Sequence, residues 1–452
     1  MFSFFCVRFS ARLPALAGAS LVAIALVAIP LVAIPLVAIP AAPVHAADTP
    51  LTLDVARQLA VERSRRFAGQ DALVAAAHDR AAAATRLPDP TLRLGVNNLP
   101  LDGPDRFSLT RDFMTMRSIG VGQEFTREDK RRARQARFER EADVAAAARV
   151  LTHADLDRDV ALAWLERHFE ESRRVLLLRQ REEARLQIEG TEAMLRGARG
   201  STADVLAARS LAEQLRDRVA ESDQRIAVAT NTLARWVGPA ADGPLASPPA
   251  FDTVPFAADD LAGRLEHHPR LAVMTRQVDV ARAQAEIART QRRSDWSVEV
   301  MYSQRGAAFS NLVSLNVSIP LQWNRKDRQD RELAAELSTV DAMQAEREEA
   351  IRGHEAEVRE MLLERQSKRE RTRQYDATLL PLAQDRTRAT LAAYRAGSGT
   401  LAAVLDARRN EIDVQLERLQ LERDVARLWA QLNYLIPAGY DASPPQDLGR
   451  TR

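Results

Sequence analysis

One structural plan occurs twice in this sequence, and that duplication limits the folds open to the chain. Residues 200–209 match residues 399–408 at a shift of roughly 199 positions. Each copy comes before about 30 residues of helical pattern that stop near a proline. Self-similarity at a fixed spacing indicates a repeated supersecondary unit. The sequence therefore predicts two similar halves, each closing with a helix that follows a tight tip.

Each half also contains two short runs in which apolar and polar residues alternate. They are residues 91–96 and 118–125 in the first half, and residues 296–300 and 313–321 in the second. Alternation with a period of two is the pattern of a strand with one apolar face. Turn-forming residues separate the members of each pair, namely Pro100, Gly103, Pro104 and Gly306. Each half is thus predicted as helix, strand, loop, strand, long helix, tip and helix.

Two helical patterns are very long, at residues 127–195 and 325–395. At 1.5 Å per residue, a helix of about 70 residues spans on the order of 100 Å. The composition agrees, because charged residues make up 28% and aromatic residues only 5%, a mixture typical of long helices. Such helices form an extended bundle or cross a compartment. The predicted fold class is mainly α with a small β part.

The N-terminus has the features of a secretory signal peptide. Arg8 and Arg12 precede an apolar run over residues 13–43, and residues 44–46 offer a signal peptidase site. The alternative is an uncleaved anchor, although the prolines of the run would break a membrane helix. The only cysteine is Cys6, which excludes a lipid anchor after the signal, a disulfide framework and a cysteine metal site.

These features divide the chain into five predicted segments. They are a signal peptide (1–46), a first repeat (47–237), a linker (238–260), a second repeat (261–437) and a flexible tail (438–452).

Four short strands cannot close a barrel within one chain, and an open sheet in lipid would leave unpaired backbone groups at its edges. Three chains would supply about twelve strands, within the range of outer-membrane barrels. The strand faces fit, because Leu92 and Leu94 share an apolar face while Arg93 and Glu299 lie on the other. The alternative is a small soluble sheet packed on helices. The expected assembly is a homotrimer with a shared 12-stranded barrel.

Two segments carry a resemblance to a known family. Residues 394–408, together with their first-half copy, and the opening residues 51–60 resemble the TolC family of outer-membrane efflux proteins. The resemblance covers about residues 51–437. It implies four strands per protomer in a shared barrel and two helical hairpins in a tunnel across the periplasm. It also implies a periplasmic adaptor (membrane fusion) protein and an inner-membrane resistance-nodulation-division pump as partners.

Within that family, residues 87–100 and 114–125 resemble the heavy-metal efflux branch, the CzcC-like proteins. The branch often has proline after the Gln-Glu-Phe of the second segment, where this chain has Thr126, and some members carry a lipidated cysteine that this chain lacks. The branch implies heavy-metal cations as the cargo of a passive duct. Alternatives are a drug-efflux or type I secretion duct of the same architecture, or a periplasmic coiled-coil structural or adaptor protein without a barrel.

The resemblance also implies site residues beyond the tips. Asp406 matches an acidic residue that lines the closed periplasmic aperture in the family, and Asp204 projects to a nearby level. A ring of carboxylates at a narrow lumen attracts cations, and Arg408 and Arg209 could hold it shut. The alternative is a solvated helix face.

Glycines at both tips predict reversals of the chain with positive φ, a conformation that glycine adopts without steric cost. By resemblance, the tips form the periplasmic mouth and dock the adaptor. The tip residues are Gly197, Gly200, Thr202, Gly397, Gly399 and Thr400.

Other candidates have weaker patterns. The basic cluster from Lys130 to Arg137 suggests outer-membrane lipid head groups or a solvated helix start, and not nucleic acid in an exported protein. His267-His268 has no partner at ligand spacing, and His354-Glu355 lacks a second histidine because Val358 occupies its position. Met114 and Met116 alternate as on one strand face; packing is their expected role, and contact with soft metal cations is the alternative. No metal, cofactor or catalytic signature is found, so the prediction is a protein that is not an enzyme.

Overall fold

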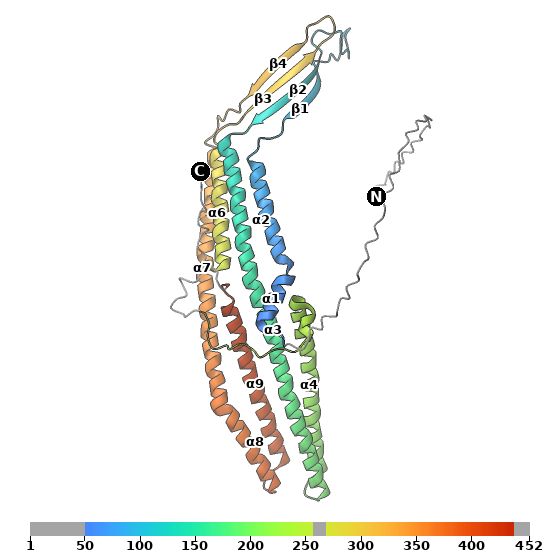
Figure 1. Cartoon of the computed structure of the whole chain (residues 1–452), viewed down its shortest axis with the longest axis vertical. Coiled ribbons are helices and arrows are strands. Elements are labelled where there is room, and N and C mark those ends of the chain that lie inside the picture. Colours follow the sequence, from blue (N-terminus) through green and yellow to red (C-terminus); the bar gives the residue numbers. More distant parts are fainter. Residues whose placement is uncertain (1–49, 256–267, 438–452) are drawn as a thin grey trace, which may run out of the picture. The chain divides into compact units, whose positions relative to one another are not determined.

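The computed structural model describes residues 50–255 and 268–437 (Figure 1). The predicted signal peptide and the predicted tail lie outside the described residues. The first half holds α1 (Leu53–Arg63), α2 (Arg65–Ala84), β1 (Thr91–Asn97), β2 (Met116–Phe125), α3 (Glu128–Arg196) and α4 (Thr202–Val237), followed by the short η1 (Gly238–Asp242). The second half holds α6 (Pro269–Thr290), β3 (Trp296–Gln304), β4 (Leu312–Ser318), α7 (Gln329–Gln374), η3 (Tyr375–Leu379), α8 (Leu380–Arg395) and α9 (Leu401–Asn433). The predicted fold class, mainly helical with a small sheet, is confirmed.

Helix α3 is the longest element, with 69 residues in one helix. Glu128 and Asp129 lie in its first turn and Arg196 in its last, so both ends complement the helix dipole. The helix spans on the order of 100 Å. It contacts α2 and α6 near the sheet and α4 and α9 toward the tips, so both halves of the chain pack on it (Figure 1).

The equivalent arm of the second half is interrupted once. Between α7 and α8, η3 forms a π turn, and Pro381 follows it in the first turn of α8. Proline has no N–H to donate and its ring clashes with the carbonyl four residues earlier in an α-helix. The wider π turn accommodates this defect, as such single turns do within α-helices. The nearly unbroken helical pattern over residues 325–395 is therefore realised as two helices, α7 and α8, with one break at η3.

One hydrophobic core joins the two halves at the level of η1. Trp164 of α3 is fully buried there, and its indole N–H donates to the carbonyl of Leu51 at 3.0 Å. The same buried cluster includes residues of α1, α4, η1 and α9, among them Leu53, Leu233, Ala241 and Trp429. Replacing a buried tryptophan with alanine costs about 3–5 kcal/mol in such a core, so this cluster holds the two halves together.

The described part of the predicted linker, residues 238–255, packs on this core. Leu51 and Leu245 form an isolated parallel bridge. Arg167 of α3 donates to the carbonyl of Gly243 at 2.9 Å, and Arg365 of α7 donates to that of Asp252 at 2.9 Å. Two buried arginines thus satisfy loop carbonyls that water would otherwise bind, and this segment is an ordered strap.

The four strands form one antiparallel sheet in the order β1-β2-β3-β4. The strand predicted for residues 313–321 ends earlier, at Ser318, because Pro320 cannot donate to a strand ladder. Within residues 50–255 and 268–437, no helix has the length and apolar character needed to cross a lipid bilayer.

Candidate functional site

The sheet has one apolar face that is exposed in the single chain. Its register aligns two rows of large apolar side chains across all four strands. The rows are Leu92, Val121, Val300 and Leu315, and Leu94, Ile119, Tyr302 and Val313. All eight are exposed, Leu94 to 71% and Val313 to 72%. A continuous apolar patch of this kind marks a contact with lipid or protein.

The other face of the sheet is polar and built around small residues. Arg93 of β1 forms an ion pair with Glu299 of β3 at 3.0 Å, across the intervening strand β2. The residues of β2 beneath this pair are Gly120 and Gly122. A Cβ on Gly120 would lie 3.0 Å from the carbonyl oxygen of Val300, so glycine allows both the close strand contact and the ion pair.

Both edges of the sheet are open within the chain. Strand β1 pairs only with β2, and β4 only with β3, among the described residues. Each edge therefore presents a row of unpaired N–H and C=O groups. Such edges are templates for strands of another chain.

The two tips have the same backbone hydrogen bonds. In the first, the N–H of Arg199 donates to the carbonyl of Met194 at 2.9 Å; in the second, Ser398 donates to Ala393 at 3.0 Å. These six-to-one bonds are those of a helix ended by a left-handed residue. The structure thereby places the two tip segments at equivalent positions of the repeat.

The predicted role of the tip glycines is wrong at three of four positions. Only Gly397 has a positive φ, of 76°, and the equivalent residue of the first tip is Ala198, with φ of 54°. Gly197 has φ of −83°. Gly200 and Gly399 lie close to the preceding helix instead, because a Cβ on either would be 3.1 Å from one of its backbone nitrogens.

The threonines of the tips have different roles. Thr400 is the N-cap of α9, and its hydroxyl accepts the N–H of Ala403 at 3.3 Å. Thr202 is the first residue of α4 and is exposed. Ser201 caps that helix, so the equivalent of Thr400 is Ser201.

The two candidate aperture carboxylates differ in their surroundings. Asp204 closes a capping box, because its Oδ2 accepts the N–H of Ser201 at 3.0 Å while its own N–H donates to the Ser201 hydroxyl at 3.1 Å. Asp406 lies in the second turn of α9 with a side chain 66% exposed, and its contact with Arg409 is 3.9 Å long. Asp406 therefore has the less engaged carboxylate.

The two candidate aperture arginines occupy equivalent positions and both reach α3. Arg209 of α4 pairs with Glu192 at 2.8 Å. Arg408 of α9 pairs with Glu183 at 2.5 Å and with Glu411 at 3.1 Å. Within the described part of one chain, neither arginine is brought to Asp204 or Asp406.

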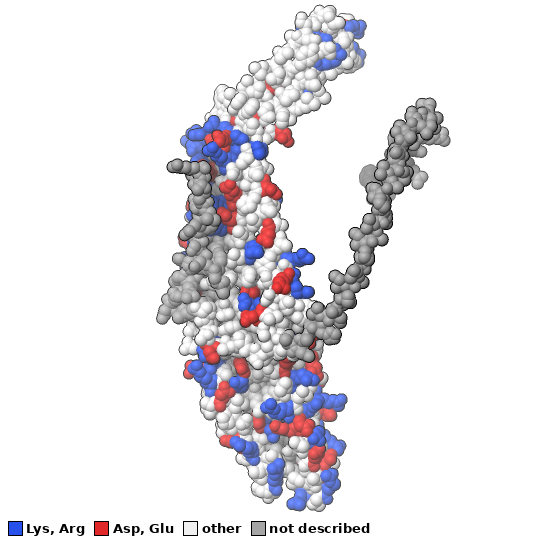
Figure 2. Space-filling view, viewed as in Figure 1, with Lys and Arg blue, Asp and Glu red and all other residues white. Residues whose placement is uncertain are grey.

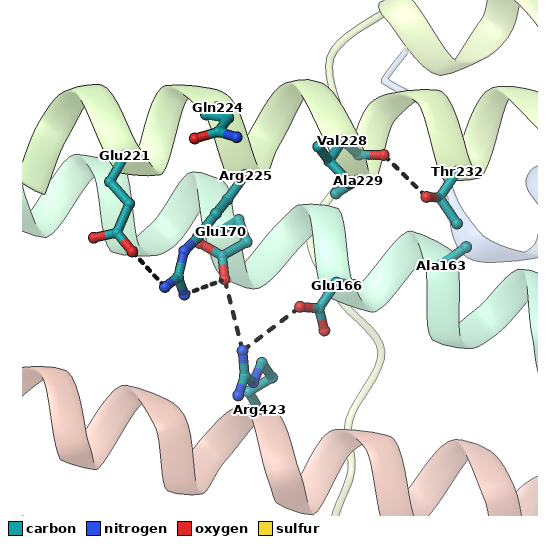
Figure 3. Close-up of a pocket in the computed structure, with 10 residues that line it drawn as sticks. All are labelled: Ala163, Glu166, Glu170, Glu221, Gln224, Arg225, Val228, Ala229, Thr232 and Arg423. Atoms are coloured by element: carbon teal, nitrogen blue, oxygen red, sulfur yellow. Dashed lines mark hydrogen bonds and ion pairs between the residues drawn. The ribbon is translucent and has the colours of Figure 1, made fainter.

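The structure contains a cavity of about 390 Å³ between α3, α4 and α9 whose lining includes several charged side chains, and the sequence pattern did not single it out (Figure 3). Glu170 is buried at its centre and lies 3.6 Å from Arg423 and 3.8 Å from Arg225. Glu166 and Glu221 complete the network through the same two arginines, at 3.6 Å and 2.6 Å. The network contains three carboxylates and two guanidinium groups, so its charges nearly balance. Because these groups come from α3, α4 and α9, their ion pairs connect the three helices. Charged pairs recur along these helices, so no sequence signal distinguishes this one.

The candidate metal ligands form only a pair. The rings of His268 and His354 lie with centroids 4.1 Å apart, although the sequence offered no partner for His268. The Nδ1 of His268 accepts the N–H of Arg270 at 3.2 Å and caps α6. The lone pair of Nδ1 is therefore engaged, and the proton of the neutral ring lies on Nε2, so neither ring nitrogen offers a free lone pair to a metal ion. Within the described ranges no group of three or more His, Cys, Asp or Glu residues could hold a metal ion. His267 lies outside them.

The remaining candidates occupy ordinary surface positions. Glu355 pairs with Arg359 at 2.6 Å. Strand β2 begins at Met116, so Met114 lies in the preceding loop and not on the strand, contrary to the prediction.

Comparisons with known proteins agree with this architecture. Residues 263–436 match the family model described as outer membrane efflux protein. No curated protein sequence matches the chain. Among solved structures, the outer-membrane channel OprN is 15% identical with a TM-score of 0.70, covering 86% of this chain and 90% of its own.

Two further solved structures are similar in the same way. The outer membrane protein VceC of Vibrio cholerae is 16% identical with a TM-score of 0.68, covering 86% of this chain and 97% of its own. CusC is 16% identical with a TM-score of 0.66, covering 84% and 91%. The chain thus has the fold of TolC-like outer-membrane channels, and its residues 263–436 match the outer membrane efflux protein family.

Proposed function

We propose that this chain is the outer-membrane channel subunit of a tripartite efflux system, a passive conduit that acts as a homotrimer and is not an enzyme. The sheet carries the proposal, because it combines two open edges with an exposed apolar face over all four strands. In lipid, such edges must be paired, and three copies in a ring would pair all of them. The face bearing Arg93 and Glu299 would then line a polar lumen.

The helical hairpins would extend the lumen through the periplasm. Their tips would dock a periplasmic adaptor, which in turn engages an inner-membrane resistance-nodulation-division pump. The equivalent hydrogen bonding of the two tips supports this part of the proposal, because one partner surface could meet both. Energy for transport would come from the pump.

Three Asp406 side chains, one from each chain, would form the acidic ring of the periplasmic aperture. The exposure of this carboxylate supports the assignment. Asp204 is the weaker candidate because one of its carboxylate oxygens is engaged by the backbone and hydroxyl of Ser201.

Heavy-metal cations are the proposed cargo, supported by the resemblance of residues 87–100 and 114–125 to the heavy-metal branch. A drug-efflux or secretion duct of the same architecture is the second candidate. Zinc, cobalt, cadmium and copper tolerance of a host with and without this protein separates the two, because loss of a metal duct lowers tolerance to the cation that it exports and leaves drug sensitivity unchanged.

Single-channel conductance in planar bilayers tests the conduit itself. The purified protein is expected to run as a detergent-stable trimer and to conduct, with a preference for cations. Asp406→Asn is expected to lower that preference, because it removes three charges from a narrow aperture. Asp385→Asn, which neutralises an exposed carboxylate of α8, is the matched control. A protein that forms neither trimers nor channels would contradict the proposal and favour a periplasmic coiled-coil role.

A further inference from the structure

The junction between the sheet and the helices concentrates positive charge. Three segments meet there: residues 127–137 after β2, residues 289–295 before β3, and residues 324–331 after β4. Together they carry thirteen basic and five acidic residues, while the whole chain is nearly neutral at net +2. Figure 2 shows the blue atoms gathered where the strands meet α3, α6 and α7. We call these three segments the basic collar.

Specific contacts bring the three collar segments together. Lys130 pairs with Asp295 at 2.7 Å, joining the first segment to the second. Arg292 pairs with Asp330 at 2.8 Å, joining the second to the third. The collar is therefore a single surface assembled from distant parts of the sequence.

The collar has more cations than its carboxylates can neutralise. Glu128, Asp129, Asp295 and Asp330 each have a basic partner within the collar, and the fifth carboxylate, Asp327, is exposed without an ion-pair partner among the described residues. Four exposed cations have no carboxylate within ion-pair distance among the residues that the structure describes. They are Arg134, Lys326, Arg328 and Arg331. An anionic partner from outside the chain would satisfy them.

Aromatic side chains lie directly beside the collar, on the side of the strands. Trp323 is 86% exposed and precedes Arg325 by two residues. Phe125 and Trp296, at the adjoining ends of β2 and β3, stack with ring centroids 4.4 Å apart. Over a few residues the surface therefore changes from aliphatic to aromatic to basic. That order is the order of a bilayer from its hydrocarbon to its head groups.

We propose that the basic collar binds phospholipids with net negative head groups in the leaflet on the helical side of the membrane. This inference rests on the proposed function, because it requires the strands to lie in the outer membrane. Each cation near an anionic surface strengthens the attraction by about fivefold. A zwitterionic head group has no net charge to offer, so the collar selects among lipids. The loops at the opposite ends of the strands face the other leaflet and are not part of this surface.

Native mass spectrometry of the detergent-solubilised trimer tests the proposal. Dioleoyl phosphatidylglycerol and dioleoyl phosphatidylethanolamine are offered at equal concentration, and the lipids retained per trimer are counted. The expected result is a preference for phosphatidylglycerol of about fivefold or more, falling as ionic strength rises. Exchange of all four unpaired cations for glutamine (R134Q, K326Q, R328Q, R331Q) is expected to abolish it.

A matched variant controls for charge alone. R179Q, R181Q, R373Q and R386Q remove the same four charges from exposed positions of α3, α7 and α8 away from the collar, and should retain the lipid preference. Equal retention of both lipids by the wild type, or a preference that survives in the collar variant, would overturn the proposal. Displacement of phosphatidylglycerol by millimolar inorganic phosphate would also overturn it, by assigning the collar to free phosphate.

Conductance distinguishes failure of this inference from failure of the proposed function. Trimers that conduct in planar bilayers without any lipid preference would refute the collar alone. A protein that neither inserts nor conducts would refute both.

Discussion

At single positions, the two tips differ by an exchange of glycine and alanine between adjacent residues. The first tip has Gly197 followed by Ala198, and the second has Ala396 followed by Gly397. Since the second residue of each pair is left-handed, the first tip places a side chain where glycine is preferred. A left-handed residue other than glycine costs about 1–2 kcal/mol.

Reciprocal substitutions test this difference. Ala198→Gly is expected to stabilise the first tip by about 0.5 kcal/mol, since relief of strain exceeds the added entropy of the unfolded chain. Gly397→Ala is expected to destabilise the second tip by about 1 kcal/mol through its φ alone, because nothing lies within 4 Å of the added Cβ. Hydrogen exchange at the amides of Arg199 and Ser398 measures both effects locally. Equal exchange rates in wild type and variants would contradict the prediction.

His268 makes stability depend on pH. Burial, together with His354, Arg270 and Arg158, lowers the pKa of this imidazole from 6.5 to about 3. The unfolded chain therefore takes up a proton below about pH 6.5 that the folded chain refuses until about pH 3, so stability is complete above pH 6.5 and is lost as the pH falls toward 3. The slope is at most about 1.4 kcal/mol per pH unit for each chain.

His268→Asn removes this titration while keeping an N-cap acceptor for α6. The variant is expected to match the wild type at pH 7.5 and to become the more stable of the two as the pH falls to 4.5. Thermal unfolding of the protein followed by helical circular dichroism measures the difference, with the exposed His78→Asn as the control. Parallel wild-type and variant curves at every pH would contradict the expectation.

Among the elements, β2 has the strictest packing requirement. It lies between β1 and β3, and its two glycines are in contact with different atoms. A Cβ on Gly120 meets the backbone of Val300 at 3.0 Å, whereas one on Gly122 meets only the Thr91 hydroxyl at that distance. A backbone cannot move without disturbing the ladder, but a hydroxyl can rotate.

The two alanine variants should therefore differ. Gly120→Ala is expected to lower the urea concentration at which the proposed detergent-stable trimer dissociates on gels, because the added Cβ separates β2 from β3. Gly122→Ala is expected to be neutral or mildly stabilising, since alanine loses less backbone entropy than glycine in a strand. Equal losses for both variants would show that the ladder tolerates neither Cβ.

Sequence patterns predicted the elements better than their contacts. The strands and their faces were predictable because alternation is a local property, and Leu92, Leu94, Arg93 and Glu299 lie on the faces expected. The strap over residues 238–255 was not, because Arg167 and Arg365 look like any solvated arginine until the fold brings loop carbonyls to them.

The candidate site shows the same limit. Repetition of residues 200–209 and 399–408 located the tips, but which residue turns left-handed depends on a one-residue offset that composition does not fix. The contact between His268 and His354 joins α6 to α7 and has no local signature.

For the molecule as a whole, the open edges of the sheet require neighbours. In the proposed trimer, β1 of one copy pairs with β4 of the next, which brings Leu92 and Leu315 near the junction. Cysteines at both positions are expected to give covalent dimers and trimers with a bifunctional maleimide, because the only native cysteine, Cys6, lies in the predicted signal peptide and far from the strands in sequence.

Single variants and interior strands provide the controls for this cross-linking. Leu92→Cys alone, or Val121→Cys with Val300→Cys, should give no covalent trimer, since the latter positions face each other within one sheet. Denaturing gels measure the products. The edge pair is tested with reagents of several lengths, and with the second cysteine at Val313 or Val317 in place of Leu315. If only monomers form in every case, pairing between copies is contradicted.

The π turn η3 has a consequence for rotational symmetry. The first hairpin has one uninterrupted arm, α3, while the second has an arm broken at residues 375–379. With two hairpins in each chain, a three-chain ring would contain six hairpins. Because only the second hairpin of each chain has a broken arm, neighbouring hairpins around the ring would differ in structure. The ring would have true threefold order and only approximate sixfold order. A partner ring of six identical subunits would then have to bind the six hairpins in two alternating ways. A partner ring of three subunits could bind each chain in the same way.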